Sequence, residues 1–219
     1  FIKATGVAEH TAELADVLAN VRSLPKTSVE LLERQIKSGL GVLIFLGDQV
    51  EPQIYNSVFG DAGAKLLPAK VGATWGDALV FGEEKVPTAF SFATGGEKLS
   101  HRIMNDFNNP DYGADFLSAI KTYKAFELEP SADDSVSVVA WFTNGKPAIV
   151  ERKVGSGVVL LCSFPATTAW GNLPTQPAFT VLMIRAANLL TLGYRSRKNL
   201  AVNEPVHGAL SLADAVRQI

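Results

Sequence analysis

The clearest pattern of apolar and polar positions lies between residues 16 and 46. Asp16–Val21 has the pattern of a short strand, and Leu31, Leu32, Gln35 and Ile36 keep one apolar face at helical spacing. Val42–Leu46 is an unbroken apolar run, which is typical of a strand covered on both faces of a parallel sheet. The three segments together predict a βαβ unit with a right-handed crossover.

Several polar residues and glycines predict where the helices of this region begin and end. Thr27 and Glu30 have the spacing of a capping box, in which each side chain accepts a hydrogen bond from the first turn of a helix. We expect Gly39 to end the same helix. Glu51-Pro52 predicts the start of a second, short helix that runs to Phe59.

In the second half of the chain the sequence pattern predicts mainly strands. Asn144-Gly145 predicts a type I′ hairpin turn, and Gly155-Ser156-Gly157 predicts another hairpin turn. A wide apolar face predicts a last helix over Pro177–Leu192. The four expected strands are Ile120–Glu129, Ser135–Thr143, Ala148–Val154 and Gly157–Phe164.

Two stretches give weaker patterns. Phe1–Val7 alternates weakly and is a candidate strand. Residues 60–115 are rich in Gly, Asp and Asn, and only Phe81 and Val86–Phe92 read as strands there.

Composition narrows the function classes. The 219 residues are 47% hydrophobic and 19% charged, with 20 basic against 22 acidic side chains and a net charge of −2. This balance argues against a nucleic-acid partner. The apolar runs are too short to span a bilayer. The single cysteine leaves the redox compartment undecided.

Five short stretches, in this order, resemble one known family. They are Leu18–Val21, Gly41–Asp48, Leu66–Lys70, Asn144–Gly157 and Trp170–Pro174. Their order is similar to that of the class I glutamine amidotransferase-like domain of bacterial membrane proteins of the BatA and von Willebrand factor A type. The segment Asn144–Gly157 also resembles the related trimerisation-type domain of some β-galactosidases.

The resemblance implies an α/β fold of the three-layer, flavodoxin-like kind with an antiparallel β excursion. It places the glutamine amidotransferase-like domain over residues 1–198, with its first strand and helix upstream of Phe1. Residues 199–219 are then a C-terminal extension, placed where the resemblance implies that a following β-rich domain would begin. The implied setting is a soluble domain of a membrane-anchored parent, with neighbouring domains of that parent as partners, including a von Willebrand factor A domain. The membrane side and the oligomeric state stay open.

In active members of this superfamily a cysteine nucleophile follows the central strand, with a histidine and an acidic residue nearby. The matching turn here is Gly47-Asp48-Gln49, which has no cysteine or serine. The resemblance therefore implies a non-catalytic binding or scaffolding module. We expect its ligand contacts at the carboxyl edge of the sheet, from Asn20, Gly47, Asp48 and Gln49.

Two other functions remain open from the residues alone. A hydrolase with a repurposed site would use Asp48 with His101, which lies in a polar loop near Asp106 and Asp111. A carbohydrate- or peptide-binding domain would stack its ligand on an indole, of Trp75, Trp141 or Trp170.

The remaining chemistry-bearing residues suggest structural roles. Trp170 and Asn172 lie in one Gly/Asn/Pro-rich loop, which makes them candidates for ligand contact as well as for a buried anchor. Cys162 lies within an apolar run and reads as a buried structural residue. No metal site and no cofactor are expected, because His10, His101 and His207 have no partner at metal-ligand spacing.

Overall fold

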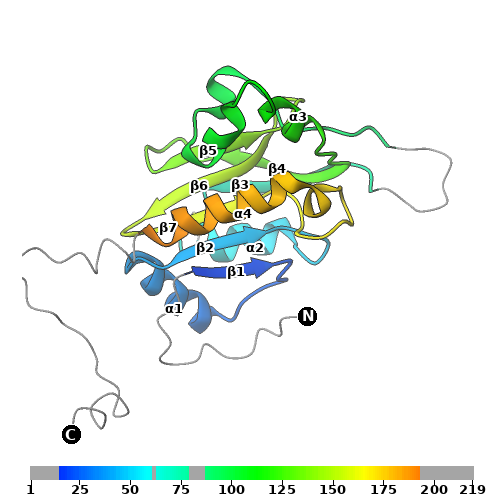
Figure 1. The fold of residues 1–219 in the computed structure, drawn as a ribbon. Helices are drawn as coiled ribbons and strands as arrows, with labels where there is room; N and C mark the ends of the chain where they lie inside the picture. The colour runs from blue at the N-terminus through cyan, green and yellow to red at the C-terminus, as the bar shows by residue number, and fades with distance from the viewer. Residues whose placement is uncertain (1–14, 61–62, 79–86, 193–219) are drawn as a thin grey trace, which may run out of the picture.

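A mixed sheet of five strands forms the centre of the molecule (Figure 1). The computed structural model describes residues 15–60, 63–78 and 87–192. The strand order is β1-β2-β7-β6-β5, in which β1, β2 and β7 run parallel and β6 and β5 run antiparallel to their neighbours. Their bounds are β1 Ala15–Ala19, β2 Gly41–Phe45, β5 Val136–Trp141, β6 Pro147–Val154 and β7 Gly157–Cys162.

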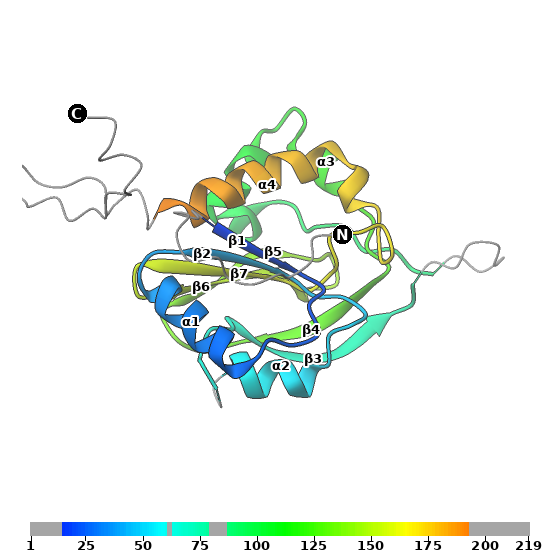
Figure 2. The ribbon, with the colours of Figure 1, turned by 90° about the horizontal axis from the view of Figure 1, so that it is seen from below.

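Helices and a second sheet cover the two faces of this central sheet (Figure 2). Helices α1 (Lys26–Lys37) and α2 (Pro52–Phe59) lie on one face, together with an antiparallel pair of strands, β3 (Ala69–Gly76) and β4 (Lys124–Pro130). The other face carries α4 (Pro177–Leu190) and the short helices η1 (Gly96–Leu99), η2 (Arg102–Asn108) and α3 (Gly113–Ser118). A 3-10 turn, η3 (Leu173–Thr175), precedes α4.

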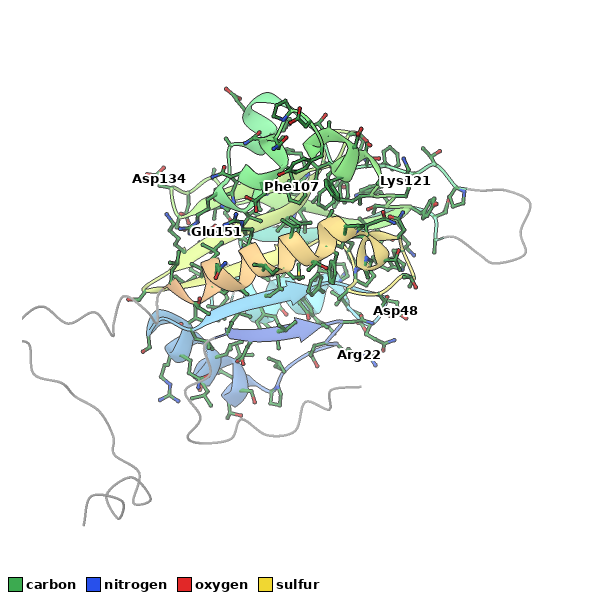
Figure 3. The ribbon with its side chains drawn as sticks, viewed as in Figure 1. Arg22, Asp48, Phe107, Lys121, Asp134 and Glu151 are labelled. Atoms are coloured by element: carbon green, nitrogen blue, oxygen red, sulfur yellow. The ribbon has the colours of Figure 1, made fainter. Side chains whose placement is uncertain are left out.

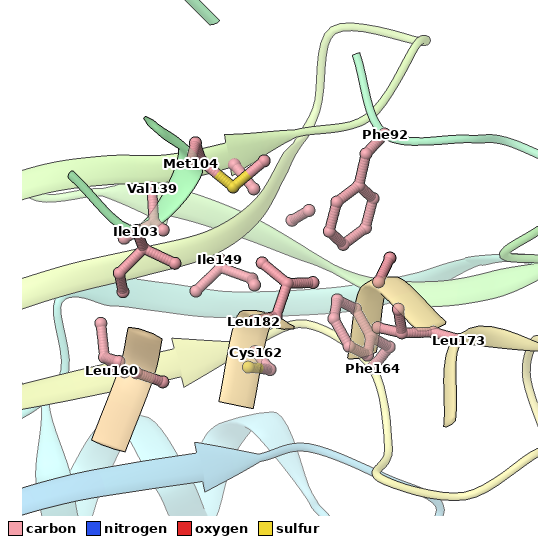
Figure 4. Packing of buried hydrophobic residues seen from close by; sticks show 14 of the residues in the cluster. Phe92, Ile103, Met104, Val139, Ile149, Leu160, Cys162, Phe164, Leu173 and Leu182 are labelled. Carbon is pink, nitrogen blue, oxygen red and sulfur yellow. The ribbon is translucent and has the colours of Figure 1, made fainter. Parts of the chain in front are cut away.

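Side chains alternate between the two faces of the central sheet, so the hydrophobic core consists of two clusters, one on each face. Leu43, Leu160 and Cys162 point to the α4 side, where they pack with residues of η2 and α4 (Figure 4). Their neighbours Val42 and Leu161 point to the α1 side and pack with α1, α2 and the small sheet. Successive side chains of a strand point to opposite faces, so an apolar run such as β2 is what two covered faces require.

The predicted βαβ unit is confirmed as β1-α1-β2, with β1 and β2 parallel. The predicted capping box is wrong. The helix begins at Lys26, one residue before Thr27, and the Pro25 carbonyl accepts the first helical bond from Val29 while no side chain caps the end. Thr27 is therefore already inside the first turn, where its hydroxyl is not placed to cap.

Two further predictions need correction. The turn at Asn144-Gly145 exists, but only Gly145 has a positive φ, of 81°, so it is not a type I′ turn; the Gly145 N–H donates to the Phe142 carbonyl across it. Strand β3 was not expected, because Ala69–Gly76 has two glycines and no regular alternation. Residues 87–92 form isolated bridges at Phe90 and Phe92 in place of a strand.

The other elements agree with prediction to within a few residues. Strand β4 begins at Lys124, later than the expected Ile120, because the end of α3 and an isolated bridge at Thr122 occupy the residues before it. The hairpin at Gly155-Ser156-Gly157 is confirmed between β6 and β7. The predictions for Phe1–Val7, Phe81 and residues 199–219 lie outside the described residues. No helix in the described part of the chain is long and apolar enough to cross a membrane.

Candidate functional site

The structure brings Asn20, Gly47, Asp48 and Gln49 together at the carboxyl edge of β1 and β2. The Asn20 side-chain amide donates to Asp48 Oδ1 at 2.6 Å, and the Gln49 backbone N–H donates to Asn20 Oδ1 at 2.9 Å. The Gln49 side chain adds a longer bond of 3.4 Å to Asp48 Oδ2. One asparagine side chain thus joins the end of β1 to the turn after β2.

The backbone adapts to this contact at two positions. Asn20 has a φ of 53°, in the left-handed region that asparagine tolerates better than most residues. Gly47 is buried beneath the Asn20 side chain, and a Cβ at Gly47 would lie 2.5 Å from Asn20 Oδ1. Glycine at this position therefore allows the Asn20 amide to reach Asp48.

Asp48 is exposed at the surface and charged at neutral pH. The hydrogen bond from Asn20 is the main cause that lowers the pKa of Asp48 from 3.8, and it outweighs the opposing effect of burial. Arg22 and Glu51 extend the polar edge through an exposed ion pair of 2.6 Å (Figure 3). This edge can present a carboxylate to a cationic or hydrogen-bond-donating group.

A buried polar site lies elsewhere, where η2 packs on β6. The His101 imidazole contacts Glu151 through Nε2 and Oε2 at 2.8 Å, and the Ile103 backbone N–H donates to His101 Nδ1 at 3.2 Å. Because Nδ1 accepts a hydrogen bond, the proton of the neutral ring lies on Nε2, and this N–H donates a hydrogen bond to Glu151 Oε2. Arg102 lies 3.5 Å from the other carboxylate oxygen of Glu151. His101 therefore caps η2 and ties it to the sheet.

Sequence reasoning missed Glu151 as the partner of His101. The side chain of Glu151 is 2% exposed, and burial alone would raise its pKa. The hydrogen bond from His101 and the electrostatic attraction of His101, Arg102 and Lys153 together outweigh burial, so the pKa of Glu151 is lowered from 4.5. The available signal was a charged residue inside the otherwise apolar strand Pro147–Val154.

The structure does not bring Asp48 and His101 together. Glu151 is level with Leu160 of β7, and Leu160 is level with Leu43 of β2. Asp48 lies five residues beyond Leu43 and past the end of β2, so two strand spacings, roughly 10 Å in all, separate it from Glu151 across the sheet, and a further stretch separates them along the strands. Figure 3 shows Glu151 and Asp48 well apart. Asp106, which the sequence places close to His101, instead forms an ion pair with Arg185.

Trp170 and Asn172 form a separate group between the loop after β7 and the segment before β4. Trp170 is buried and packs on Phe126 with ring centroids 5.5 Å apart. Both ends of the Asn172 side chain are used: Oδ1 accepts from the Lys121 N–H at 2.7 Å, and Nδ2 donates to the Ala119 carbonyl at 3.0 Å. The cavity beside Trp170 measures about 10 Å³, which is room for one water molecule.

The other indoles and the thiol are also committed to packing. The Trp75 ring packs edge-on against the rings of Phe90 and Phe142, with ring centroids 5.1 and 5.3 Å apart. The Lys98 ammonium lies 3.7 Å above the half-buried ring of Trp141. Cys162 is buried, and burial raises the pKa of its thiol far above the ordinary value. Across the described ranges, no group of three or more His, Cys, Asp or Glu is placed to hold a metal ion.

This chain is similar to known proteins in its structure but not in its sequence. No family model matches the sequence, and no curated protein matches it. A cytoplasmic protein from Salmonella typhimurium, STM3548, is similar with a TM-score of 0.57 and 14% identity, over 80% of this chain and 71% of that protein. A second, STM1381 from Salmonella typhimurium LT2, has a TM-score of 0.51 and 14% identity, over 83% and 71%.

A β-galactosidase from Bacillus circulans sp. alkalophilus aligns with a TM-score of 0.49 and 11% identity, over 80% of this chain and 22% of the enzyme. The two Salmonella proteins share the general α/β fold of this chain.

Proposed function

We propose that this chain is a non-catalytic binding or scaffolding module of the flavodoxin-like, glutamine amidotransferase-like kind. Its contact surface is the carboxyl edge of β1 and β2, around Asp48. Its setting is a larger, membrane-anchored bacterial protein, with neighbouring domains of that protein as partners, a von Willebrand factor A domain among them.

The separation of the reactive groups supports this proposal most directly. Asp48 is held by Asn20 and Gln49, His101 is held by Glu151, and Cys162 is buried. A nucleophile and its base must lie within hydrogen-bond reach, or one water apart, to act together. None of these three groups has another of the three as its hydrogen-bond partner in the described structure.

The chemistry of the Asp48 edge supports a binding role. A surface carboxylate with a lowered pKa keeps its charge in all but acid solution. Asn20 and Gly47 fix its position, and a fixed carboxylate loses little conformational freedom when a cationic group binds it. The carboxyl edge of parallel strands is also where open α/β sheets place their ligands.

Two measurements test the proposal. Chemical shifts of backbone amides, followed while arginine amide is added as a cationic probe, are expected to move at Asn20, Asp48 and Gln49. The Asp48→Asn variant should lose these shifts. The matched control is Asp134→Asn, since Asp134 is also exposed but lies in the turn before β5, far from this edge (Figure 3).

The second measurement addresses catalysis. The intact chain is incubated with a glutamine-analogue diazoketone and with p-nitrophenyl acetate, and we expect no covalent adduct by mass spectrometry and no turnover above the buffer rate. Turnover that is abolished by Asp48→Asn or by His101→Asn would overturn the proposal and favour the repurposed hydrolase. Shifts confined to the surroundings of Trp141 on addition of a soluble oligosaccharide would favour the carbohydrate-binding alternative.

A further inference from the structure

A cavity lies between helices α1 and α2, which contact each other beside it (Figure 2). Its volume is about 460 Å³, within the range of roughly 300–1,000 Å³ that is typical of small-molecule sites. One face of α1, the end of α2 and the chain just after α2 line it. The residues that line it do not include Asn20, Asp48 or Gln49, so the cavity is separate from the Asp48 edge.

The floor of the cavity is apolar. Val29 of α1 is buried, while Leu24, Val58 and Ala64 are half-buried and pack on the same hydrophobic cluster. The half-buried side chains leave apolar surface in contact with water inside the cavity. An apolar body that covers this surface is favoured in proportion to the area it removes from water.

Hydrogen bonds of the backbone fix the wall that follows α2. The Ala64 N–H donates to the Val58 carbonyl at 3.1 Å, and the Gly63 N–H donates to the Gly60 carbonyl at 3.0 Å. A Cβ at Gly63 would lie 2.3 Å from the Val58 carbonyl oxygen, so the chain approaches the end of α2 closely. A ligand in the cavity therefore meets a preformed wall and does not have to order one.

The α1 side of the cavity carries an excess of negative charge. Glu30 and Glu33 are three positions apart and share one face of the helix, while Lys26 lies one turn before Glu30. The Lys26 ammonium is 4.0 Å from the Glu30 carboxylate, and Lys37, which does not line the cavity, pairs with Glu33 at 2.6 Å. Exposed pairs of this kind stabilise a helix only slightly, so the ammonium of a ligand can replace a lysine. Two carboxylates against one ammonium in the lining favour a cationic ligand.

We propose that this cavity binds a small hydrophobic amine, a molecule with one ammonium group and an aromatic or branched apolar body. The body packs on Leu24, Val58 and Ala64, and the ammonium lies against Glu30 and Glu33. The cavity shares no residue with the Asp48 edge, so this proposal and the proposed function fail or succeed separately.

The test is a titration of the full chain with tryptamine at pH 7, followed by the chemical shifts of backbone amides. Tryptophol, which has a hydroxyl in place of the ammonium, is the neutral probe, and indole-3-acetate is the anionic probe. We expect tryptamine to shift the amides of Val29, Glu30, Val58 and Ala64 in a saturable manner. Tryptophol should bind about two- to fivefold more weakly, the effect of losing one exposed ion pair, and indole-3-acetate more weakly than tryptophol.

Two variants test the charge and the floor separately. The double variant Glu30→Gln, Glu33→Gln should weaken the binding of tryptamine about two- to fivefold and leave that of tryptophol unchanged. Ala64→Leu should fill part of the cavity and weaken the binding of both probes. The matched control is Glu129→Gln, because Glu129 is an exposed, lysine-paired carboxylate of β4 that does not line the cavity. This control should bind tryptamine as the parent chain does.

The proposal is overturned if tryptamine causes no saturable shifts around the cavity, or if tryptamine and tryptophol bind equally well. It is also overturned if the double variant binds tryptamine as tightly as the parent chain. Shifts centred on Asn20 and Asp48 alone would place the amine at the edge of the sheet instead. Cavity amides that shift with protein concentration in the absence of any probe would assign the cavity to a second copy of the chain instead.

Discussion

Removing the bond between His101 and Glu151 should loosen η2 from the sheet by a measurable amount. The two informative changes are His101→Asn, which keeps a capping side chain for the Ile103 N–H but is too short to reach Glu151, and Glu151→Leu, which keeps an apolar volume. The side chains are 12% and 2% exposed, so solvent does not screen the contact appreciably.

The magnitude follows from what each change leaves behind. A hydrogen bond to a charged group contributes about 1.5–3 kcal/mol. His101→Asn leaves a buried carboxylate with Arg102 at 3.5 Å as its remaining partner, and breaking a buried pair from one side costs about 3–5 kcal/mol. Glu151→Leu leaves the imidazole N–H without an acceptor. Because the double variant removes both groups, it should lose less than the sum of the two single losses.

The assay is urea unfolding of the parent, the two single variants and the double variant at pH 7.5. We expect a coupling free energy of about 1.5–3 kcal/mol between the two sites. Independent sites add within about 0.5 kcal/mol. A coupling smaller than that would refute the conclusion that His101 is held by Glu151 and would return the histidine to the list of candidate catalytic groups.

The pair also predicts a dependence of stability on pH. Because the folded pKa of Glu151 is lowered below 4.5, the ionised carboxylate stabilises the fold above that value. This contribution is lost as the pH falls through the folded pKa. The difference in unfolding free energy between the parent and Glu151→Gln should therefore shrink on acidification, and a difference that grows would contradict the assignment.

Three further outcomes are expected. Gly157→Ala should cost about 1–3 kcal/mol in urea unfolding, because the new Cβ would lie 2.2 Å from the Ile36 carbonyl oxygen. Asn56→Ala should cost about 1–3 kcal/mol by the same measurement, because the Asn56 amide bonds both the N–H and the carbonyl of Val71, at 2.9 and 2.8 Å, on the outer edge of β3. Cys162 should resist iodoacetamide until the protein unfolds, since burial raises its thiol pKa.

Neighbouring substitutions provide the controls. At Gly145 a Cβ meets nothing within 4 Å, so Gly145→Ala should cost only the strain of a positive φ, about 1 kcal/mol. Ser57→Ala removes a hydrogen bond within α2 and should be nearly neutral beside Asn56→Ala. Equal losses within either pair, or modification of Cys162 in the folded protein at the rate seen for the unfolded chain, would contradict the structural explanations.

Much of the sheet follows from local sequence patterns. The apolar run of β2, the helical spacing of α1 and the glycines at the β6–β7 hairpin each depend on residues close together in the chain. The sequence pattern does not predict strand β3, because its pairing with β4 joins residues 48 to 61 positions apart. The start of α1 was misplaced because the Pro25 carbonyl, and no side chain, completes its first turn.

In the candidate site, too, some features follow from the local sequence and others depend on the tertiary structure. The turn after β2 identifies Gly47, Asp48 and Gln49 from sequence, because a strand followed by a short turn is a local signal. The bond from Asn20 to Asp48 depends on two parallel strands ending side by side, and the bond from His101 to Glu151 on η2 packing across β6.

The sequence by itself therefore determined the order of the central elements and the exposed polar turn, since hydrophobic spacing and turn residues act over a few positions. The tertiary structure alone decided which polar groups meet, because hydrogen bonds between distant segments depend on the register and the packing of the whole sheet.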